Sequence, residues 1–296
     1  MPALDQIQIR DPFVVREGET YYLFGSTDKD IWHSDGVGFD VYRAKGQLRD
    51  FEGPFPAFRP GPGFWSTKNF WAPEVYASGG AYVMFATFLP VEGRRGTAVL
   101  RSESIMGPYL PWSDGPVTPR DWECLDGTLY VDETGSPWMV FCHEWTQVGD
   151  GQVCAMRLSE DLSRAAGEPH VLFTASSASW AAPLKRRAPG SYVTDGPYVV
   201  RHHSGRLLIL WSSFGEDGNY CLGVASSFSG GLDGPWTQSE RPLFESDGGH
   251  GMVFSTVGGD LYLVIHTPNK TPHERLLFVG LRETAEGLET TGEIIS

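Results

Sequence analysis

Hydrophobic and aromatic residues occur in short runs along this chain, and a turn that contains glycine separates the two runs of each pair. The first example lies in residues 9–25, where runs at residues 13–15 and 21–24 flank a turn at Gly18. Short runs rich in Val, Tyr, Phe and Leu are typical of buried strands, and long amphipathic helical patterns are hard to find. The pattern therefore predicts an all-β protein built from hairpins.

The same arrangement of a polar entry, a strand, a glycine turn and an aromatic strand occurs five times. The gaps between successive turn glycines are 62, 55, 70 and 54 residues, and these glycines are Gly18, Gly80, Gly135, Gly205 and Gly259. This period is too long for a solenoid repeat but suits a four-stranded propeller blade with insertions. Five copies predict one five-bladed β-propeller that occupies residues 1–296 as a single domain.

The sequence also predicts the segments that lie between and beyond these hairpins. Residues 31–32 form a further strand of the first blade, and the Pro-rich and Gly-rich residues 50–68 connect two blades. Residues 162–190 form a loop whose Trp180 reaches a pocket, and a strand at residues 276–281 closes the chain. The N-terminal residues are expected to pair with the last blade, because an unclosed ring would leave a bare strand edge.

Composition and charge narrow the classes of function. The formal net charge is −14, and no extended Lys/Arg run is present, which argues against nucleic acid or an anionic membrane as partner. No apolar run is long enough to span a membrane, and the N-terminus has no signal-peptide pattern. None of the four cysteines has zinc-site spacing, so free thiols and a cytoplasmic location are expected.

Four residues at the entries of the copies are the candidates for chemistry: Asp11, Asp126, Asp195 and His250. The innermost strand of every propeller blade runs beside the axis, so its first residues open on one face. A single Asp-Pro or Asp-Gly is an ordinary turn dipeptide, but three carboxylates crowded at one axis repel and desolvate each other, which favours catalysis. At a sugar, one carboxylate can activate water, a second can protonate the leaving oxygen, and a third can tune that acid.

Other side chains near the entries are candidates for substrate binding. These are Trp71, His143, Trp145 and Arg275. Aromatic rings can pack against the faces of a sugar, and an arginine can reach the axis to bind a hydroxyl. Ordinary packing within a blade is the alternative for each of them.

The entry phrases also carry a resemblance to a known family. They are RDPFVV from residue 10, FWAPEVY from residue 70, LDGTLYVDETGSPWMVF from residue 125, DGPYVV from residue 195 and GGHGMVF from residue 248. In their order and spacing they resemble glycoside hydrolase family 43, a family of inverting five-bladed propellers that act on α-L-arabinofuranosides and β-xylosides. The resemblance implies Asp11 as general base, Asp126 as the residue that tunes the acid, and Asp195 as general acid. It also implies that His250 holds a Ca²⁺ or similar ion, largely through waters, with no organic cofactor.

The fourth phrase departs from the family pattern. The usual acid is Glu in a Glu-Gly-Pro phrase, whereas this chain has Asp195, which is one methylene shorter. Glu144 is the other candidate acid, and Asp195 is favoured because its neighbours keep the motif.

The favoured function is an inverting exo-acting α-L-arabinofuranosidase acting on short arabinose-containing oligosaccharides. A β-xylosidase or other furanosidase of the same fold is an alternative, and so is a non-catalytic carbohydrate-binding propeller. A fructan-type hydrolase would need an Asn-Asp-Pro-Asn phrase near the N-terminus, which this chain lacks.

Overall fold

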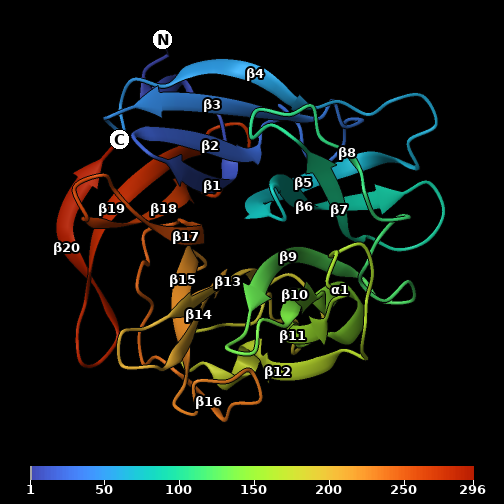
Figure 1. Cartoon of the computed structure of the whole chain (residues 1–296). Helices are drawn as coiled ribbons and strands as arrows, with labels where there is room; N and C mark the ends of the chain where they lie inside the picture. Colours follow the sequence, from blue (N-terminus) through green and yellow to red (C-terminus); the bar gives the residue numbers. More distant parts are fainter. Residues whose placement is uncertain (1) are drawn as a thin grey trace.

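Five four-stranded antiparallel sheets form a ring around a central axis in the computed structural model, which describes residues 2–296 (Figure 1). Each sheet is a meander, so strands that follow one another in the chain are neighbours in the sheet. The first strand of each sheet lies beside the axis, where it contacts the first strands of other sheets. This is the five-bladed β-propeller that the repeat period predicts.

The blades follow one another in chain order, and each has four strands. Blade 1 has β1 (Arg10–Glu17), β2 (Thr20–Ser26), β3 (Phe39–Lys45) and β4 (Glu52–Phe58). Blade 2 has β5 (Ser66–Ser78), β6 (Ala81–Pro90), β7 (Gly96–Ser102) and β8 (Leu110–Pro111). Blade 3 has β9 (Cys124–Val131), β10 (Pro137–His143), β11 (Gln152–Arg157) and β12 (His170–Thr174). Blade 4 has β13 (Asp195–Arg201), β14 (Leu207–Phe214), β15 (Tyr220–Ser227) and β16 (Trp236–Gln238). Blade 5 has β17 (Gly249–Ser255), β18 (Leu261–Thr267), β19 (Arg275–Glu283) and β20 (Leu288–Ile295).

Helical structure in residues 2–296 is limited to three short segments, η1 (Leu4–Gln6), α1 (Trp145–Val148) and η2 (Ala175–Ser177). No helix in this range is long and apolar enough to cross a membrane. All four cysteines are free and buried, as the sequence predicts. The cytoplasmic location inferred from them stays a prediction.

The faces of neighbouring blades are held together by apolar packing. Fully buried side chains fill the spaces between sheets, among them Phe24, Phe88, Phe141, Trp211 and Ile265. Burying one large apolar side chain stabilises a protein by roughly 1.5–3 kcal/mol. The ring is therefore held chiefly by contacts between sheet faces, and each four-stranded hydrogen-bonded ladder stays within one blade.

Closure of the ring agrees only in part with the sequence prediction. The N-terminal segment meets blade 5 through a single antiparallel bridge between Gln8 and Arg275. The Arg275 guanidinium also donates from Nε to the backbone oxygen of Asp5 at 2.6 Å. All four strands of blade 5 come from the C-terminal part of the chain, so the N-terminus anchors this blade without adding a strand.

Four predictions about local structure were wrong. Residues 31–32 form a turn, and the supposed connection at residues 50–68 contains the edge strand β4. Strand β12 lies within the supposed loop at residues 162–190, and β20 rather than residues 276–281 ends the chain. The proline residues of β4 concealed it, because proline is tolerated on an edge strand but argues against a central one.

Candidate active site

A cavity of about 820 Å³ opens at the end of the axis where the innermost strands begin. This volume falls within the range of roughly 300–1,000 Å³ that is typical of small-molecule sites. All five blades contribute to its wall, through residues that include Asp11, Trp71, Asp126, Asp195 and His250. The sequence prediction that the five entries meet at one end of the axis is therefore confirmed.

The same irregularity occurs at the start of the innermost strand in every blade. Its register slips by one residue against the second strand, which defines a β-bulge. One residue in each bulge has a φ between 46° and 57°, and these five residues are Asp11, Ala72, Asp126, Gly196 and His250. A bulge re-aims a side chain, and here it turns Asp11, Asp126 and His250 into the cavity.

This repeat shows that one expectation from the sequence was wrong. Asp195 is not equivalent to Asp11 and Asp126, because Gly196 holds the bulge position in blade 4. Asp195 pairs with Ser212 in the ladder, as Arg10 pairs with Ser26 in blade 1. The acid candidate therefore enters the cavity from a different backbone position than the other two carboxylates.

Hydrogen bonds between blades fix the bulges. In four blades the backbone N–H of the bulge residue donates to a side chain on the second strand of the preceding blade. In three blades a hydroxyl accepts it at 2.9 Å, as Ser212 Oγ does from His250, and His266 Nδ1 accepts from Asp11 at 3.2 Å. Blade 3 has Cys142 at the accepting position, and the N–H of Gly196 donates instead to Asp126 Oδ2 at 3.0 Å. The sequence did not indicate these hydrogen bonds between blades.

Asp11 is held in its ionised form. Its Oδ2 accepts a hydrogen bond of 2.6 Å from the Ser26 hydroxyl, and its Oδ1 lies 3.1 Å from His250 Nδ1. Burial alone would raise the pKa of this carboxyl, but the adjacent His250 outweighs it and holds the pKa well below its usual range. Asp11 can therefore accept a hydrogen bond from water across the working pH range.

Asp126 and Asp195 have the opposite character. Burial, together with repulsion from Asp195 and Asp11, raises the pKa of Asp126 to about 7 despite the attraction of His250. Burial also raises the pKa of Asp195, whose Oδ2 accepts a hydrogen bond of 3.0 Å from Tyr220. Because the two carboxyls repel each other, the pair keeps a proton to higher pH than an isolated carboxyl would.

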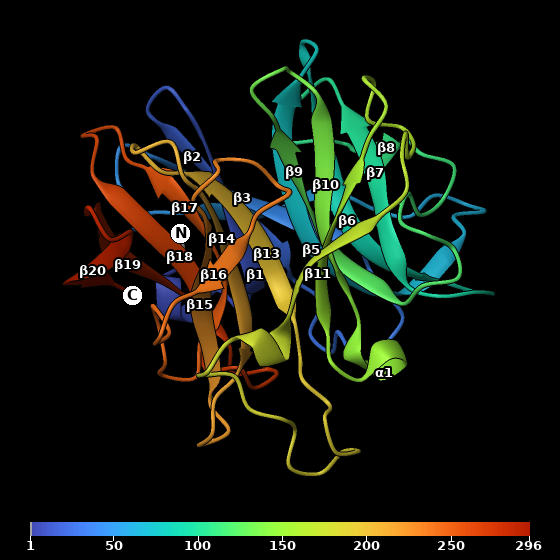
Figure 2. The same ribbon diagram turned by 90° about the horizontal axis from the view of Figure 1, so that it is seen from below.

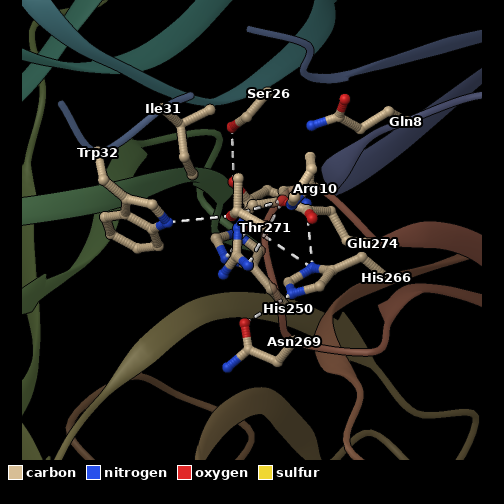
Figure 3. Close-up of polar contacts among 12 residues, drawn as sticks. Gln8, Arg10, Ser26, Ile31, Trp32, His250, His266, Asn269, Thr271 and Glu274 are labelled. Carbon is tan, nitrogen blue, oxygen red and sulfur yellow. Dashed lines mark hydrogen bonds and ion pairs between the residues drawn. The ribbon is translucent and has the colours of Figure 1, made fainter. Parts of the chain in front are cut away.

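Two histidines lie close to the Asp11 carboxylate and differ in charge; both are labelled in Figure 3. Burial disfavours protonated His250, but Asp11, Asp126 and Asp195 raise its pKa to about 10. His266 is fully buried, and burial and the charge of Arg10 lower its pKa to about 3. Neutral His266 accepts the Asp11 N–H at Nδ1, so its Nε2–H donates to Asn269 Oδ1 at 3.3 Å.

Glu144, the other candidate acid, also lines the cavity. Its Oε2 forms an ion pair of 3.1 Å with Arg95 and accepts a hydrogen bond of 2.7 Å from Thr146. Burial raises the pKa of Glu144, and the Arg95 charge opposes that rise. Both partners favour the ionised form, which suits a wall residue better than a proton donor.

One side of the cavity wall bridges blades 1 and 5. Trp32 Nε1 donates to Thr271 Oγ1 at 3.0 Å, and the Arg10 guanidinium lies over the Trp32 ring at 5.2 Å (Figure 3). Arg10 in turn faces Glu274 at 3.8 Å. Neither Trp32 nor Arg10 was predicted to be a site residue, although Arg10 directly precedes Asp11.

The predicted substrate-binding residues divide into two groups. Trp71 and Trp145 line the cavity, with Arg95 over the Trp71 ring at 4.7 Å. His143 does not line it, because its ring stacks on Trp122 and bonds to Gln147 and Gln152.

Two further residues lie away from the cavity. Arg275 is tied to backbone oxygens of Asp5, Pro272 and Glu274. Trp180, predicted to reach the pocket, packs on Trp211 in the core of blades 3 and 4.

A cluster of potential metal ligands lies outside the cavity. His202, His203 and Glu283 have ligand atoms within 4.8 Å of one another. Both ring nitrogens of His202 are already engaged, by Ser204 Oγ and Thr284 O. Within the cavity, His250 Nδ1 lies 3.1 Å from Asp11 and 3.7 Å from Asp126.

The model of glycosyl hydrolases family 43 matches residues 4–286, nearly the whole chain. The chain belongs to this family. Its members hydrolyse glycosidic bonds, so the protein is a glycosidase with a carbohydrate substrate.

Named relatives include both exo- and endo-acting enzymes. An extracellular exo-α-(1→5)-L-arabinofuranosidase of Cellvibrio japonicus is 25% identical, and the alignment covers 95% of this chain and 86% of that protein. An extracellular endo-α-(1→5)-L-arabinanase of Thermotoga petrophila is also 25% identical, with 88% of this chain but 57% of that protein covered. The crystal structure of an endo-arabinase from Bacteroides thetaiotaomicron superposes with a TM-score of 0.88 at 36% identity, covering 96% of this chain and 97% of that one.

Proposed function

We propose that this family 43 enzyme is an inverting exo-acting α-L-arabinofuranosidase that removes arabinose from short oligosaccharides. The observation that carries the proposal is the meeting of one ionised carboxylate, Asp11, with a proton-holding pair, Asp126 and Asp195, in one cavity. Arabinose is the favoured sugar because an exo-arabinofuranosidase and an endo-arabinase match nearly the whole chain at 25% and 36% identity.

The chemistry follows from the two ionisation states. Asp11 takes a proton from a water whose oxygen attacks the anomeric carbon, while Asp195 gives its proton to the departing oxygen as the glycosidic bond breaks. Attack opposite the leaving group inverts the anomeric configuration. We expect the Asp11 and Asp195 carboxyls to be separated by the ~6.5–9.5 Å that inverting enzymes use to seat this water. Asp126 shares a proton with Asp195, and the repulsion between the two carboxyls keeps that proton available to the acid.

The bridged wall supports exo action. An endo-acting enzyme needs room for the polymer on both sides of the cleaved bond. The Trp32–Thr271 hydrogen bond joins blades 1 and 5 across one side of the cavity, where such a chain would otherwise continue. A terminal arabinose fits a site that is closed on this side.

A hard cation on the axis is part of this proposal. Three buried carboxylates face one histidine, which leaves the cavity floor with excess negative charge that a Ca²⁺ ion would neutralise. His250 fits the role in its neutral form, which a bound cation would favour over the protonated ring: its Nδ1 can then donate to Asp11, while Nε2 has no protein partner among residues 2–296. Few protein oxygens converge there, so waters would supply most ligands. Elemental analysis of the dialysed protein should find calcium in the parent and little in His250→Ala, and equal content in both would remove His250 as the ligand.

Product analysis tests the proposed activity. Incubation with linear α-1,5-arabinan oligosaccharides should release arabinose alone from the start of the reaction, and NMR should detect the inverted anomer first. Early appearance of di- and trisaccharides would instead indicate endo action. Release of xylose from xylo-oligosaccharides, without release of arabinose, would establish the β-xylosidase alternative.

A further inference from the structure

A short basic segment lies at the mouth of the cavity. Lys185, Arg186 and Arg187 belong to the loop between η2 and β13, and all three line the cavity although they are solvent-exposed. Figure 2 shows this yellow loop projecting from the end of the propeller at which α1 also lies. The three residues are consecutive cations in a chain whose formal net charge is −14.

No carboxylate neutralises these cations. Within residues 2–296 none of the three forms an ion pair, whereas Arg95 deeper in the cavity pairs with Glu123 and Glu144. The nearby loop that contributes Gly215 and Gly218 to the wall carries acids, but its Asp217 is engaged with Asn219. The mouth therefore offers positive charge that no carboxylate of residues 2–296 pairs with.

The loop is tethered at its base, which keeps these cations near the mouth. Leu184 N–H donates to Ser191 O at 2.8 Å, and Arg187 N–H closes a turn onto Leu184 O at 3.2 Å. The Arg187 guanidinium lies over the ring of Trp145 at 5.5 Å. An aromatic surface and cationic groups thus stand side by side, as is suitable for binding a sugar that carries a negative charge.

We propose that Lys185, Arg186 and Arg187 form a subsite for a carboxylate on the substrate, so that the preferred substrates are acidic oligosaccharides with a uronate-type group. The proposal rests on the proposed exo-arabinofuranosidase function. The carboxylates of the floor repel an anion, so the charged group lies outside the cleaved unit, on the leaving-group side. The guanidinium groups of the two arginines and the ammonium group of Lys185 can each donate hydrogen bonds to carboxylate oxygens. Exposed ion pairs of this kind strengthen binding modestly, and salt weakens them.

Matched substrates test the subsite. An arabino-oligosaccharide oxidised at its reducing end to the aldonate carries a carboxylate, and the same compound reduced to the alditol is neutral. At low ionic strength the parent should hydrolyse the aldonate with a kcat/KM about fivefold higher, a size expected for several exposed ion pairs. Added salt should remove this preference.

The variant Lys185→Gln/Arg186→Gln/Arg187→Gln should bring the aldonate-to-alditol ratio close to one. The variant Arg16→Gln/Lys45→Gln/Arg49→Gln removes the same charge from exposed sites in blade 1 and should keep the parent ratio. Equal kcat/KM values for both substrates in the parent, or an undiminished ratio in the loop variant, would overturn the proposal.

A binding measurement separates this proposal from the proposed function. Calorimetry with trigalacturonate, which contains no arabinose, should detect weaker binding to the loop variant than to the parent and the blade 1 variant. If no arabino-oligosaccharide is hydrolysed but this difference is found, the proposed function fails while the anionic subsite stands. If arabinose is released but trigalacturonate binds equally to all three proteins, the subsite is wrong.

Discussion

Asp11 and Asp126 occupy equivalent positions in their blades, yet their surroundings drive their ionisation in opposite directions. Asp11 receives the Ser26 hydroxyl at 2.6 Å and lies 3.1 Å from His250 Nδ1. Asp126 lies farther from His250, at 3.7 Å, and its neighbour Asp195 is a like charge. Opposite shifts of this kind are what the proposed roles of base and proton-holding group require within one site.

The raised pKa of Asp126 should make stability depend on pH. The folded protein keeps this proton up to pH about 7, whereas the unfolded chain loses it near pH ~3.9. Stability that is fully present at low pH is therefore lost as pH rises from about 4 to 7. Asp126→Asn removes this loss. The free energy of unfolding of the variant minus that of the parent should therefore be larger at pH 8 than at pH 4.5, by at least ~1 kcal/mol.

Urea denaturation at the two pH values measures that difference. The exposed Asp35→Asn provides the control, with a similar effect on stability at both. If the stability of Asp126→Asn relative to the parent is the same at pH 4.5 and pH 8, the Asp126 carboxyl is ionised at both pH values. A cation bound beside Asp126 would have this effect.

The sequence indicated these carboxylates but not the side chains that support them. Asp11, Asp126 and Asp195 were found because three acids at repeat entries are hard to explain by turn chemistry. Ser26 and His266 lie on second strands, and nothing in their own segments indicates that they accept hydrogen bonds from the backbone of another blade. Their roles depend on blade packing, which a single sequence does not specify.

At the scale of elements, the repeated β-bulge is what turns three separate strands into one site. The sequence signal for it is a Pro or Gly directly after each bulge residue, as in Asp11-Pro12 and His250-Gly251. Aligning the copies on that residue places Gly196, not Asp195, at the repeat position. The predicted equivalence of the three carboxylates failed because the copies were aligned on acidic residues instead of on backbone geometry.

Gly196 is expected to be intolerant of a side chain. A Cβ at this position would lie 2.6 Å from the ring carbons Cγ and Cδ2 of His250, and its φ of 51° already disfavours other residues. Gly205 has a φ of 87°, but a Cβ there would meet no atom within 4 Å, so Gly205→Ala isolates the backbone cost of about 1 kcal/mol.

Gly196→Ala should cost clearly more stability than Gly205→Ala and should lower kcat/KM, because His250 must move away from Asp11. Thermal unfolding and arabinosidase assays on both variants provide the comparison. Similar melting temperatures and activities for the two would mean that the His250 ring does not need the space beside Gly196.

Inner strands were predictable and outer strands were not, for a physical reason. The second strands of the blades are apolar runs buried on both faces, such as β14. The outer strands are short or exposed, as in β8 and β20, and therefore have no hydrophobic pattern. Their existence follows from completing a blade, which only the assembled ring shows.

At the scale of the whole molecule, five blades share one axial cavity, and the loops around it determine which substrates enter. The repeat period was sufficient to predict the ring and the end at which the site lies. The loops that shape the cavity, including the Trp32–Thr271 bridge, vary between blades and follow no repeat. Specificity was therefore less predictable than fold.

Removing the bridge should shift the enzyme toward longer substrates. Trp32→Ala should raise the ratio of activity on arabinan polymer to activity on arabinotriose, because a chain could then extend between blades 1 and 5. Thr271→Val removes the hydrogen bond with little change in shape and should have a smaller effect. An unchanged ratio in Trp32→Ala, measured by product chromatography, would show that this wall does not determine chain length.

The central claim, that Asp11 from blade 1 and Asp195 from blade 4 act as base and acid, is tested most directly by leaving-group dependence. kcat/KM would be measured for dinitrophenyl α-L-arabinofuranoside and for arabinobiose with the parent, Asp11→Ala, Asp195→Ala and Glu144→Ala. Loss of the base should lower both values by about 100- to 10,000-fold, since water must always be activated. Loss of the acid should lower arabinobiose hydrolysis by a similar factor but leave the dinitrophenyl substrate within about tenfold of the parent. A selective loss of arabinobiose hydrolysis in Glu144→Ala, with Asp195→Ala unaffected, would contradict the assignment.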